Sequence, residues 1–269
     1  MGKKEKSIPK FQNEIIETHC HLDYLKDQSP EEAIKEAGEY NVQKIITIAV
    51  SPSNLDSVID IAKRNSNVYT TQGIHPHDAK DYNQEVEAKI RLNANSDNKV
   101  VAVGEIGLDY YYDNSPRKEQ IEAFRSQMNI ATDLDFPVVI HSRDAEEDTK
   151  TILDDFKDLQ KQKGVIHSFT SKLDLAEEAL NLGYYLGFNG IITFKNAHEV
   201  REAVKLAPIE KTLIETDSPF LTPDPFRGRP NTPKYLPLVA QKIAEIKDLD
   251  VEEVISITTQ NAISLFFKP

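Results

Sequence analysis

The chain has 269 residues, of which 39% are hydrophobic and 28% charged, enough for a sizeable core in one large domain or two ordinary ones. Its net charge of −12 argues against a protein that coats nucleic acid through a broad basic face, although bound cations could reverse the field inside a pocket. A single cysteine excludes an internal disulfide, and no apolar run is long enough to cross a membrane. We therefore expect a soluble cytoplasmic protein.

Residues 1–12 are polar and are predicted to form a flexible N-terminal tail, with a single domain over residues 13–269. Within that domain, short runs rich in valine and isoleucine alternate with helical patterns. The runs are too short for helices and are typical of buried parallel strands. The eight predicted strands cover residues 14–19, 44–50, 68–74, 100–105, 137–141, 164–167, 184–188 and 212–215.

The segments between the strands carry helix signals. In "SPEEAIKEAGEY", Ser29 is the predicted N-cap and Glu32 completes a capping box, and Ser115 with Pro116 repeats the same device. Residues 230–267 predict two helices after a loop rich in proline and glycine. Eight strand–helix units without a break in composition predict an α/β protein, a single (β/α)₈ TIM barrel with additional C-terminal helices. An open doubly wound sheet is the alternative, but no Gly-x-Gly-x-x-Gly follows the first strand.

Polar side chains fall where the predicted strands end. In a barrel the carboxyl ends of all strands meet on one face, where active sites lie. A lone histidine there is usually a packing residue and a lone carboxylate can be a helix cap, but so many on one rim favour a functional site. The residues at these ends are His19, His21, His75, Glu105, His141, His167 and Asp217. His77 and Asp109 are more simply explained as residues that fix loops.

Imidazoles and carboxylates without thiolates suit Mg²⁺, Mn²⁺ or Zn²⁺. His19 and His21 alternate along a strand and can reach the same ion, whereas Cys20 between them points into the core. Five or six ligands are too many for one catalytic zinc, so we expect two divalent metal ions bridged by Glu105. Asp217 would hold one ion and act as the general base. The predicted reaction is metal-assisted hydrolysis, with a phosphodiester, an amide and a lactone all open as substrates.

Six stretches in chain order carry a family resemblance: "THCHLD", "GIHPHDA", "VGEIGLDYY", "PVVIHSRDA", "GVIHSF" and "ETDSPFLTP", the last followed by "RGRPNTP". They are similar to the successive motifs of the TatD family of metal-dependent deoxyribonucleases. The resemblance runs from about residue 15 to the C-terminus. It implies hydrolysis of DNA, typically as a 3′→5′ exonuclease that accepts single-stranded ends, in DNA degradation or repair. It implies neither a membrane nor an obligate protein partner.

The resemblance also implies roles for individual residues. One ion would be held by His19, His21, Glu105 and Asp217. The other would be held by Glu105, His141 and His167, and His75 would contact the scissile phosphate. The arginines that could neutralise phosphate are Arg143, Arg227 and Arg229, although a rim arginine is as often structural. Tyr110, Tyr111 and Tyr112 could stack on a base or only pack a loop. The chain departs from the family at Glu17, where aspartate is more frequent.

Two other functions fit the same residues. A metal-dependent amidohydrolase, esterase or lactonase could use the same barrel, although Glu105 stands where many such enzymes have a strand-four lysine. A non-catalytic metal-binding protein is the third reading. The presence of every expected ligand and of the expected base counts against it.

Overall fold

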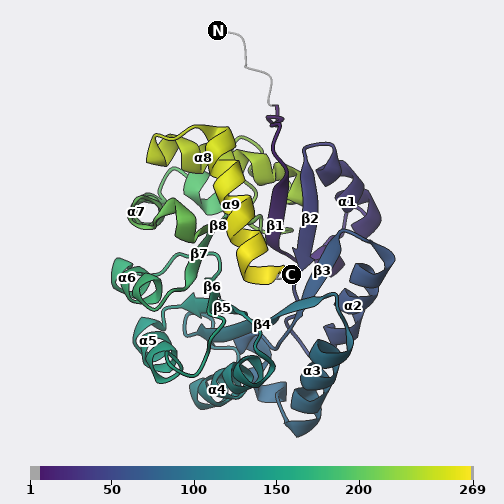
Figure 1. Cartoon of the computed structure of the whole chain (residues 1–269), viewed down its shortest axis with the longest axis vertical. Helices are drawn as coiled ribbons and strands as arrows, with labels where there is room; N and C mark the ends of the chain where they lie inside the picture. Colours follow the sequence, from purple (N-terminus) through teal and green to yellow (C-terminus); the bar gives the residue numbers. More distant parts are fainter. Residues whose placement is uncertain (1–6, 268–269) are drawn as a thin grey trace.

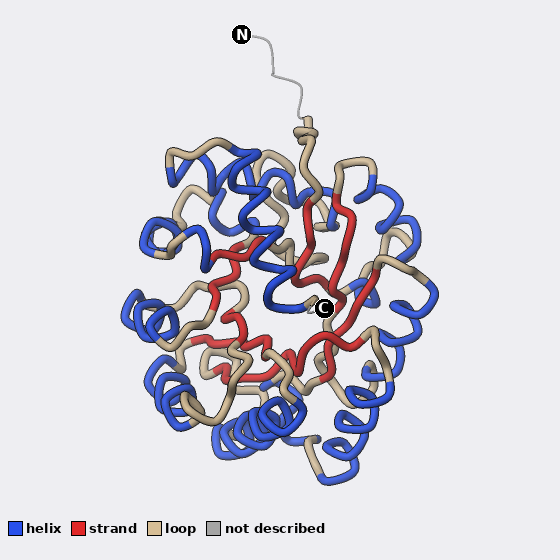
Figure 2. Tube along the Cα trace, in the orientation of Figure 1, coloured by secondary structure: helices blue, strands red, loops and turns tan. Residues whose placement is uncertain are grey.

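Eight parallel strands form one sheet in the order of the chain, and they curl into a ring (Figures 1 and 2). The computed structural model describes residues 7–267. The strands are β1 (Ile15–Cys20), β2 (Val42–Thr47), β3 (Val68–Gln72), β4 (Val100–Asp109), β5 (Val138–Arg143), β6 (Gly164–Ile166), β7 (Tyr185–Phe188) and β8 (Thr212–Ile214). Backbone hydrogen bonds from Asp217 to His19 and from His21 to Ser218 join the chain after β8 to the end of β1. The predicted TIM barrel is confirmed.

Helices surround the ring, as Figure 1 shows. The α-helices of residues 7–267 are α1 (Pro30–Gly38), α2 (Leu55–Arg64), α3 (Gln84–Ser96), α4 (Arg117–Leu134), α5 (Glu146–Asp155), α6 (Leu173–Asn181), α7 (His198–Leu206), α8 (Leu236–Lys247) and α9 (Val251–Phe266). Short 3₁₀ helices are η1 (Leu22–Tyr24), η2 (Pro76–Asp81), η3 (Gly190–Thr193), η4 (Ile209–Lys211) and η5 (Pro233–Tyr235). Within the described part of the chain, no helix has the length and apolarity that a membrane crossing needs. The two predicted C-terminal helices, α8 and α9, are confirmed.

Two apolar layers hold the barrel together. Successive strand side chains point to opposite faces, so Ile45 of β2 packs outward under the helices while Ile46 packs into the barrel. Leu265 of α9 joins the inner layer. At the start of β8, the carbonyl oxygen of Thr212 accepts a hydrogen bond of 2.8 Å from the Asn261 side chain of α9. Helix α9 therefore closes the amino-terminal end of the barrel and leaves the carboxyl end for a site.

The helix starts follow the predictions only in part. The capping box of α1 is present, because the Glu32 N–H donates to Ser29 Oγ and the Ser29 N–H donates to Glu32 Oε2. The predicted cap of α4 is wrong: Pro116 is the N-cap residue and gives no side-chain cap. The Ser115 hydroxyl is used elsewhere, since it donates to the carbonyl oxygen of His77 at 2.8 Å. It therefore holds η2 against the start of α4.

Strand β4 continues beyond its predicted end at Glu105 and pairs with β5 as far as Asp109 opposite Arg143. Gly107 permits this approach, because its φ is 136° and a Cβ there would overlap the carbonyl oxygen of His141. The pairing register shifts beside Glu105, which is the position of a bulge. Bulges redirect side chains next to active sites. Glu105 and His141 therefore project from within their strands.

Residues 1–6 of the expected tail lie outside the described residues, and the expected division into a tail and one domain stays a prediction. Beyond them, Ile8 packs against the cluster formed by Phe226, Tyr235 and Leu238. The Gln12 N–H donates to a carboxylate oxygen of Glu252 at 2.7 Å. Residues 8–12 thus lie against the barrel.

Candidate active site

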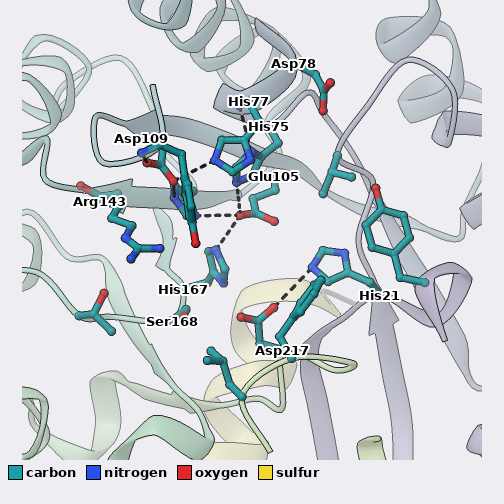
Figure 3. A pocket seen from close by; sticks show the side chains of 18 of the residues that line it. His21, His75, His77, Asp78, Glu105, Asp109, Arg143, His167, Ser168 and Asp217 are labelled. Carbon is teal, nitrogen blue, oxygen red and sulfur yellow. Dashed lines mark hydrogen bonds and ion pairs between the residues drawn. The ribbon is translucent and has the colours of Figure 1, made fainter. Parts of the chain in front are cut away.

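A pocket of about 650 Å³ opens at the carboxyl end of the barrel (Figure 3). The predicted site residues that line it are His21, His75, Glu105, His141, Arg143, His167 and Asp217. His19 is fully buried beneath them. The structure therefore brings together all six predicted metal ligands. Cys20 is buried within the core cluster, as expected from the alternation of the strand.

The Glu105 carboxylate lies at the centre of the site. One of its oxygens faces His141 and His167, and the other faces His19. Oε1 lies 2.8 Å from His167 Nε2 and 3.2 Å from His141 Nδ1. Oε2 lies 3.4 Å from His19 Nε2. Figure 3 shows His75 on one side of Glu105 and His167 on the other, with the His21–Asp217 pair farther from Glu105. One carboxylate that offers an oxygen to each side is what a bridging ligand requires.

The first side is built by the junction of β1 with the chain after β8. The hydrogen bonds between His19 and Asp217 and between His21 and Ser218 fix the two backbones together. As a result, Asp217 Oδ1 lies 3.5 Å from His21 Nε2 and 3.8 Å from His19 Nε2. Donor atoms of these three side chains lie within 4.8 Å of one another, close enough to hold one ion.

The second side is oriented by Asp109. Its Oδ2 accepts from His141 Nε2 at 3.0 Å, so the other ring nitrogen of His141 presents a lone pair toward Glu105. A carboxylate behind a histidine fixes the tautomer in this way at metal sites. Asp109 is itself held, because its Oδ1 accepts from the backbone N–H groups of Tyr111 and Tyr112. His77 also contacts Oδ2, at 3.0 Å, which agrees with the expected loop-fixing role of this pair.

His167 has a second carboxylate behind its ring. Glu215 Oε1 lies 3.5 Å from His167 Nδ1 and accepts from the Ser168 N–H at 2.6 Å. Glu215 is not among the predicted site residues, although it follows β8 directly in the stretch "ETD". The rings of His167 and His19 lie face to face, with centroids 3.8 Å apart. This packing leaves little freedom for either imidazole to turn.

His75 differs from the other histidines, although it lies in a group with Glu105 and His141 that could hold an ion. Its Nδ1 accepts the backbone N–H of His77 at 3.1 Å, and burial lowers its pKa to about 4. A neutral ring whose Nδ1 is an acceptor carries its proton on Nε2. That nitrogen faces Glu105 Oε1 at 3.3 Å. His75 is therefore a hydrogen-bond donor into the pocket rather than a metal ligand.

The charges of the site favour a cation. Burial would raise the pKa of Glu105, but His167 and its other histidine neighbours hold it well below its ordinary value, so the carboxylate is ionised. Burial would also raise the pKa of Asp217, yet His21, His19 and His167 lower it. Within residues 7–267, four buried ring nitrogens have no hydrogen-bond partner, namely both of His19, Nδ1 of His21 and Nδ1 of His167. Ionised carboxylates beside unsatisfied imidazole nitrogens fit divalent metal ions.

The three arginines are placed differently. Only Arg143 lines the pocket, at 3.9 Å from the centre of the Tyr111 ring and 4.8 Å from that of Tyr112. Arg227 stacks on Phe194 at 4.0 Å and borders a neighbouring hollow. Arg229 lies over the Phe226 ring and lines neither cavity. The sequence could not show which arginine lines the pocket, because contacts with aromatic rings on the loops determine where each guanidinium lies.

Comparison with known proteins identifies the family of the chain. The family model described as "TatD related DNase" matches residues 16–267. The chain is 41% identical to a Bacillus subtilis protein named "Uncharacterized metal-dependent hydrolase YabD", over 94% of this chain and 98% of that protein. It is 33% identical to the Erwinia amylovora "3'-5' ssDNA/RNA exonuclease TatD", over 90% of this chain and 95% of that protein.

A solved structure is similar along its whole length. The Escherichia coli TatD homologue YjjV superposes with a TM-score of 0.88 at 30% identity, covering 95% of this chain and 98% of that one. The barrel, the ring of histidines and carboxylates around Glu105 and these matches lead to the same assignment. The chain belongs to the TatD family of metal-dependent hydrolases.

Proposed function

We propose that this protein is a divalent-metal-dependent deoxyribonuclease that removes nucleotides from DNA ends in the 3′→5′ direction. The observation that carries the proposal is the division of the Glu105 carboxylate, with one oxygen toward His19 and the other toward His141 and His167. Two ions would be held on its two sides. The proposed ligands are His19, His21, Glu105 and Asp217 for one ion, and Glu105, His141 and His167 for the other.

When bound, such ions make an attacking water more acidic and stabilise negative charge on the oxygens of the transferred phosphoryl group. The chain supplies the remaining parts. Asp217, ionised and at the pocket surface, accepts the proton of the water. His75 donates from Nε2 to a phosphate oxygen, since its Nδ1 is already occupied by the His77 N–H. Arg143 adds a positive charge at the mouth of the pocket.

A phosphodiester suits these donors better than a carbonyl substrate. Its two non-bridging oxygens, which share one negative charge, can accept from a neutral imidazole and from a guanidinium at the same time, and arginine is the side chain best matched to phosphate. Within residues 7–267 Arg143 has no carboxylate partner, so its donors remain available. The name of the Erwinia amylovora relative supports the same substrate class.

A substrate panel tests the proposal. Purified protein with Mg²⁺, Mn²⁺ or Zn²⁺ would be offered DNA and RNA oligonucleotides, a lactone, an aryl ester and a dipeptide. Release of nucleotides from DNA, stopped by EDTA, supports the proposal. Turnover of the lactone, ester or dipeptide without nucleotide release would point to the amidohydrolase-like alternative. Metal binding without any turnover would point to a non-catalytic metal-binding protein.

A further inference from the structure

Three exposed aromatic side chains line the pocket, namely Tyr24, Tyr112 and Phe220, and a fourth, Tyr111, adjoins the pocket through its contact with Arg143. They are 38–58% exposed, and within residues 7–267 no other phenylalanine or tyrosine side chain is as exposed. The other large exposed hydrophobic side chains are leucines outside the pocket. Scattered exposed apolar residues need no explanation, but a set of rings gathered at one opening indicates a binding role.

The rings form two stations on opposite sides of Glu105. At the first station, the Tyr24 ring is stacked on His21 with centroids 5.4 Å apart, and the Phe220 ring meets His21 edge-on at 6.2 Å. Tyr24 lies in η1, directly after β1, and Phe220 follows Asp217 in the loop after β8. This station therefore stands beside the His21–Asp217 pair.

The second station stands beside Arg143. The Arg143 guanidinium lies over the rings of Tyr111 and Tyr112, and Tyr112 meets the His77 ring at 5.4 Å. Figure 3 shows Arg143 and His21 on opposite sides of Glu105. Tyr110 does not belong to the station, since its hydroxyl donates to Asp148 at 2.5 Å and Arg117 covers its ring. Its role is to pack the loop on the barrel.

We propose that the two stations stack the bases of the two nucleotides that flank the scissile phosphate. This inference rests on the proposed nuclease function. The bond to be cut joins two nucleotides, and a phosphate that accepts from His75, beside Glu105, places one of them toward His21 and the other toward Arg143. Ring faces on each side give each base a stacking partner that tolerates any sequence. Apolar wall residues Val50, Ile191 and Leu221 extend the same surface.

The two stations also define the substrate. Bases inside a duplex are stacked on each other and paired, so their faces cannot stack on the aromatic rings of the two stations. The enzyme must therefore act on an end with at least two unpaired nucleotides, or on an end that frays by that length. We expect the rate on a duplex with a 3′ overhang to rise with overhang length up to two nucleotides and then to level off.

The test pairs side chains with bases. Phe220→Leu and Tyr112→Leu remove a ring face at each station while keeping an apolar side chain, and both sites are more than half exposed. Tyr40→Leu makes the same substitution beside β2 at the opposite end of the barrel and serves as the control. The substrates are single-stranded oligonucleotides that are unmodified, abasic at the 3′-terminal nucleotide, or abasic at the penultimate nucleotide.

We expect each rim variant to lower kcat/KM on the unmodified strand by roughly 5- to 150-fold, the effect of one lost base stack, with Tyr40→Leu unchanged. Each should be no slower than wild type on the substrate that lacks its own partner base. Equal losses on unmodified and abasic strands, or no loss at all, would overturn the inference while leaving the nuclease function intact. A wild-type protein that cuts no unmodified strand would instead remove the proposed function itself.

Discussion

The backbone N–H of His77 donates to Nδ1 of His75, at 3.1 Å. A metal on His75 Nε2 would require the ring proton to move to Nδ1, where it would face that N–H. Two donors cannot share one hydrogen bond, so His75 keeps its proton on Nε2. We therefore do not expect the group of His75, Glu105 and His141 to hold an ion, despite the short distances between its donor atoms. Local backbone structure, rather than distance alone, decides which histidines can be ligands.

His75→Ala should lower kcat by about 100-fold and leave the metal content unchanged, because it removes a donor to the phosphate and no ligand. Elemental analysis of the purified variant and initial rates on a DNA oligonucleotide provide the two measurements. His141→Ala is the comparison variant and should lose metal. If His75→Ala lost as much metal as His141→Ala, His75 would be a metal ligand and would not carry its proton on Nε2.

Asp109→Asn should weaken metal binding by about 10- to 100-fold. The asparagine oxygen would keep the N–H groups of Tyr111 and Tyr112, so its NH₂ group would face His141 Nε2. That arrangement reverses the histidine tautomer and puts a proton on the nitrogen that faces Glu105. Mn²⁺ titration calorimetry measures the change. His77→Gln removes the other neighbour of the carboxylate and should affect Mn²⁺ binding much less. Equal effects of the two substitutions would contradict this account.

Metal affinity should increase with pH between about 6 and 8. Burial lowers the pKa of His21 and His141, but their carboxylate neighbours more than reverse this, so both pKa values are raised. An imidazole must lose its proton to bind a metal, so each proton displaced steepens the pH dependence by up to about tenfold per pH unit. Mn²⁺ binding constants measured in one buffer series would show the slope. A flat profile would mean that neither histidine binds the ion.

Glu17→Gln should stabilise the metal-free protein increasingly as the pH rises from 5 to 7.5. Burial raises the pKa of Glu17 to about 8, against an ordinary value of 4.5. A carboxyl whose pKa is raised by folding contributes its full stability below pH 4.5 and loses it progressively toward pH 8, by up to about 1.4 kcal/mol per pH unit. Glutamine keeps an oxygen for the N–H groups of His19 and Thr216 and has no charge to bury.

Urea unfolding in EDTA, at pH 5 and pH 7.5, measures this difference, which we expect to grow by about 1–3 kcal/mol. Glu177→Gln, at an exposed site on α6, controls for effects of the substitution on the unfolded chain. If the difference between Glu17→Gln and wild type were the same at both pH values, the pKa of Glu17 would not be raised in the folded protein.

Most of the fold could be predicted because valine- and isoleucine-rich runs mark buried parallel strands directly. All eight strands are present, with bounds that differ by a few residues. The exceptions have local causes. Strand β4 extends because Gly107 allows close contact with β5, and β5 extends with it. The predicted cap at Ser115 failed because its hydroxyl bonds to the His77 carbonyl, a partner 38 residues away.

The gathering of the histidines and carboxylates could be predicted because the carboxyl ends of the strands meet on one face of a barrel, whatever the conformation of the loops. The arginines and aromatic residues proposed to bind the substrate could not be predicted in the same way. Arg143 and Arg227 look equivalent in sequence, yet only Arg143 lines the pocket, because Arg227 stacks on Phe194. Tyr24 and Phe220 carry no pattern of their own. Their exposure, which is what makes them informative, depends on the packing of loops that are distant in sequence.

Digestion of a 5′-labelled single-stranded DNA oligonucleotide, with Mg²⁺ or Mn²⁺, tests the central claim most directly. We predict a ladder of products that shortens one nucleotide at a time from the 3′ end, that stops in EDTA, and that falls by about 10²- to 10⁴-fold in Asp217→Asn. An intact oligonucleotide, products cut first at the 5′ end, or undiminished digestion by Asp217→Asn would contradict it.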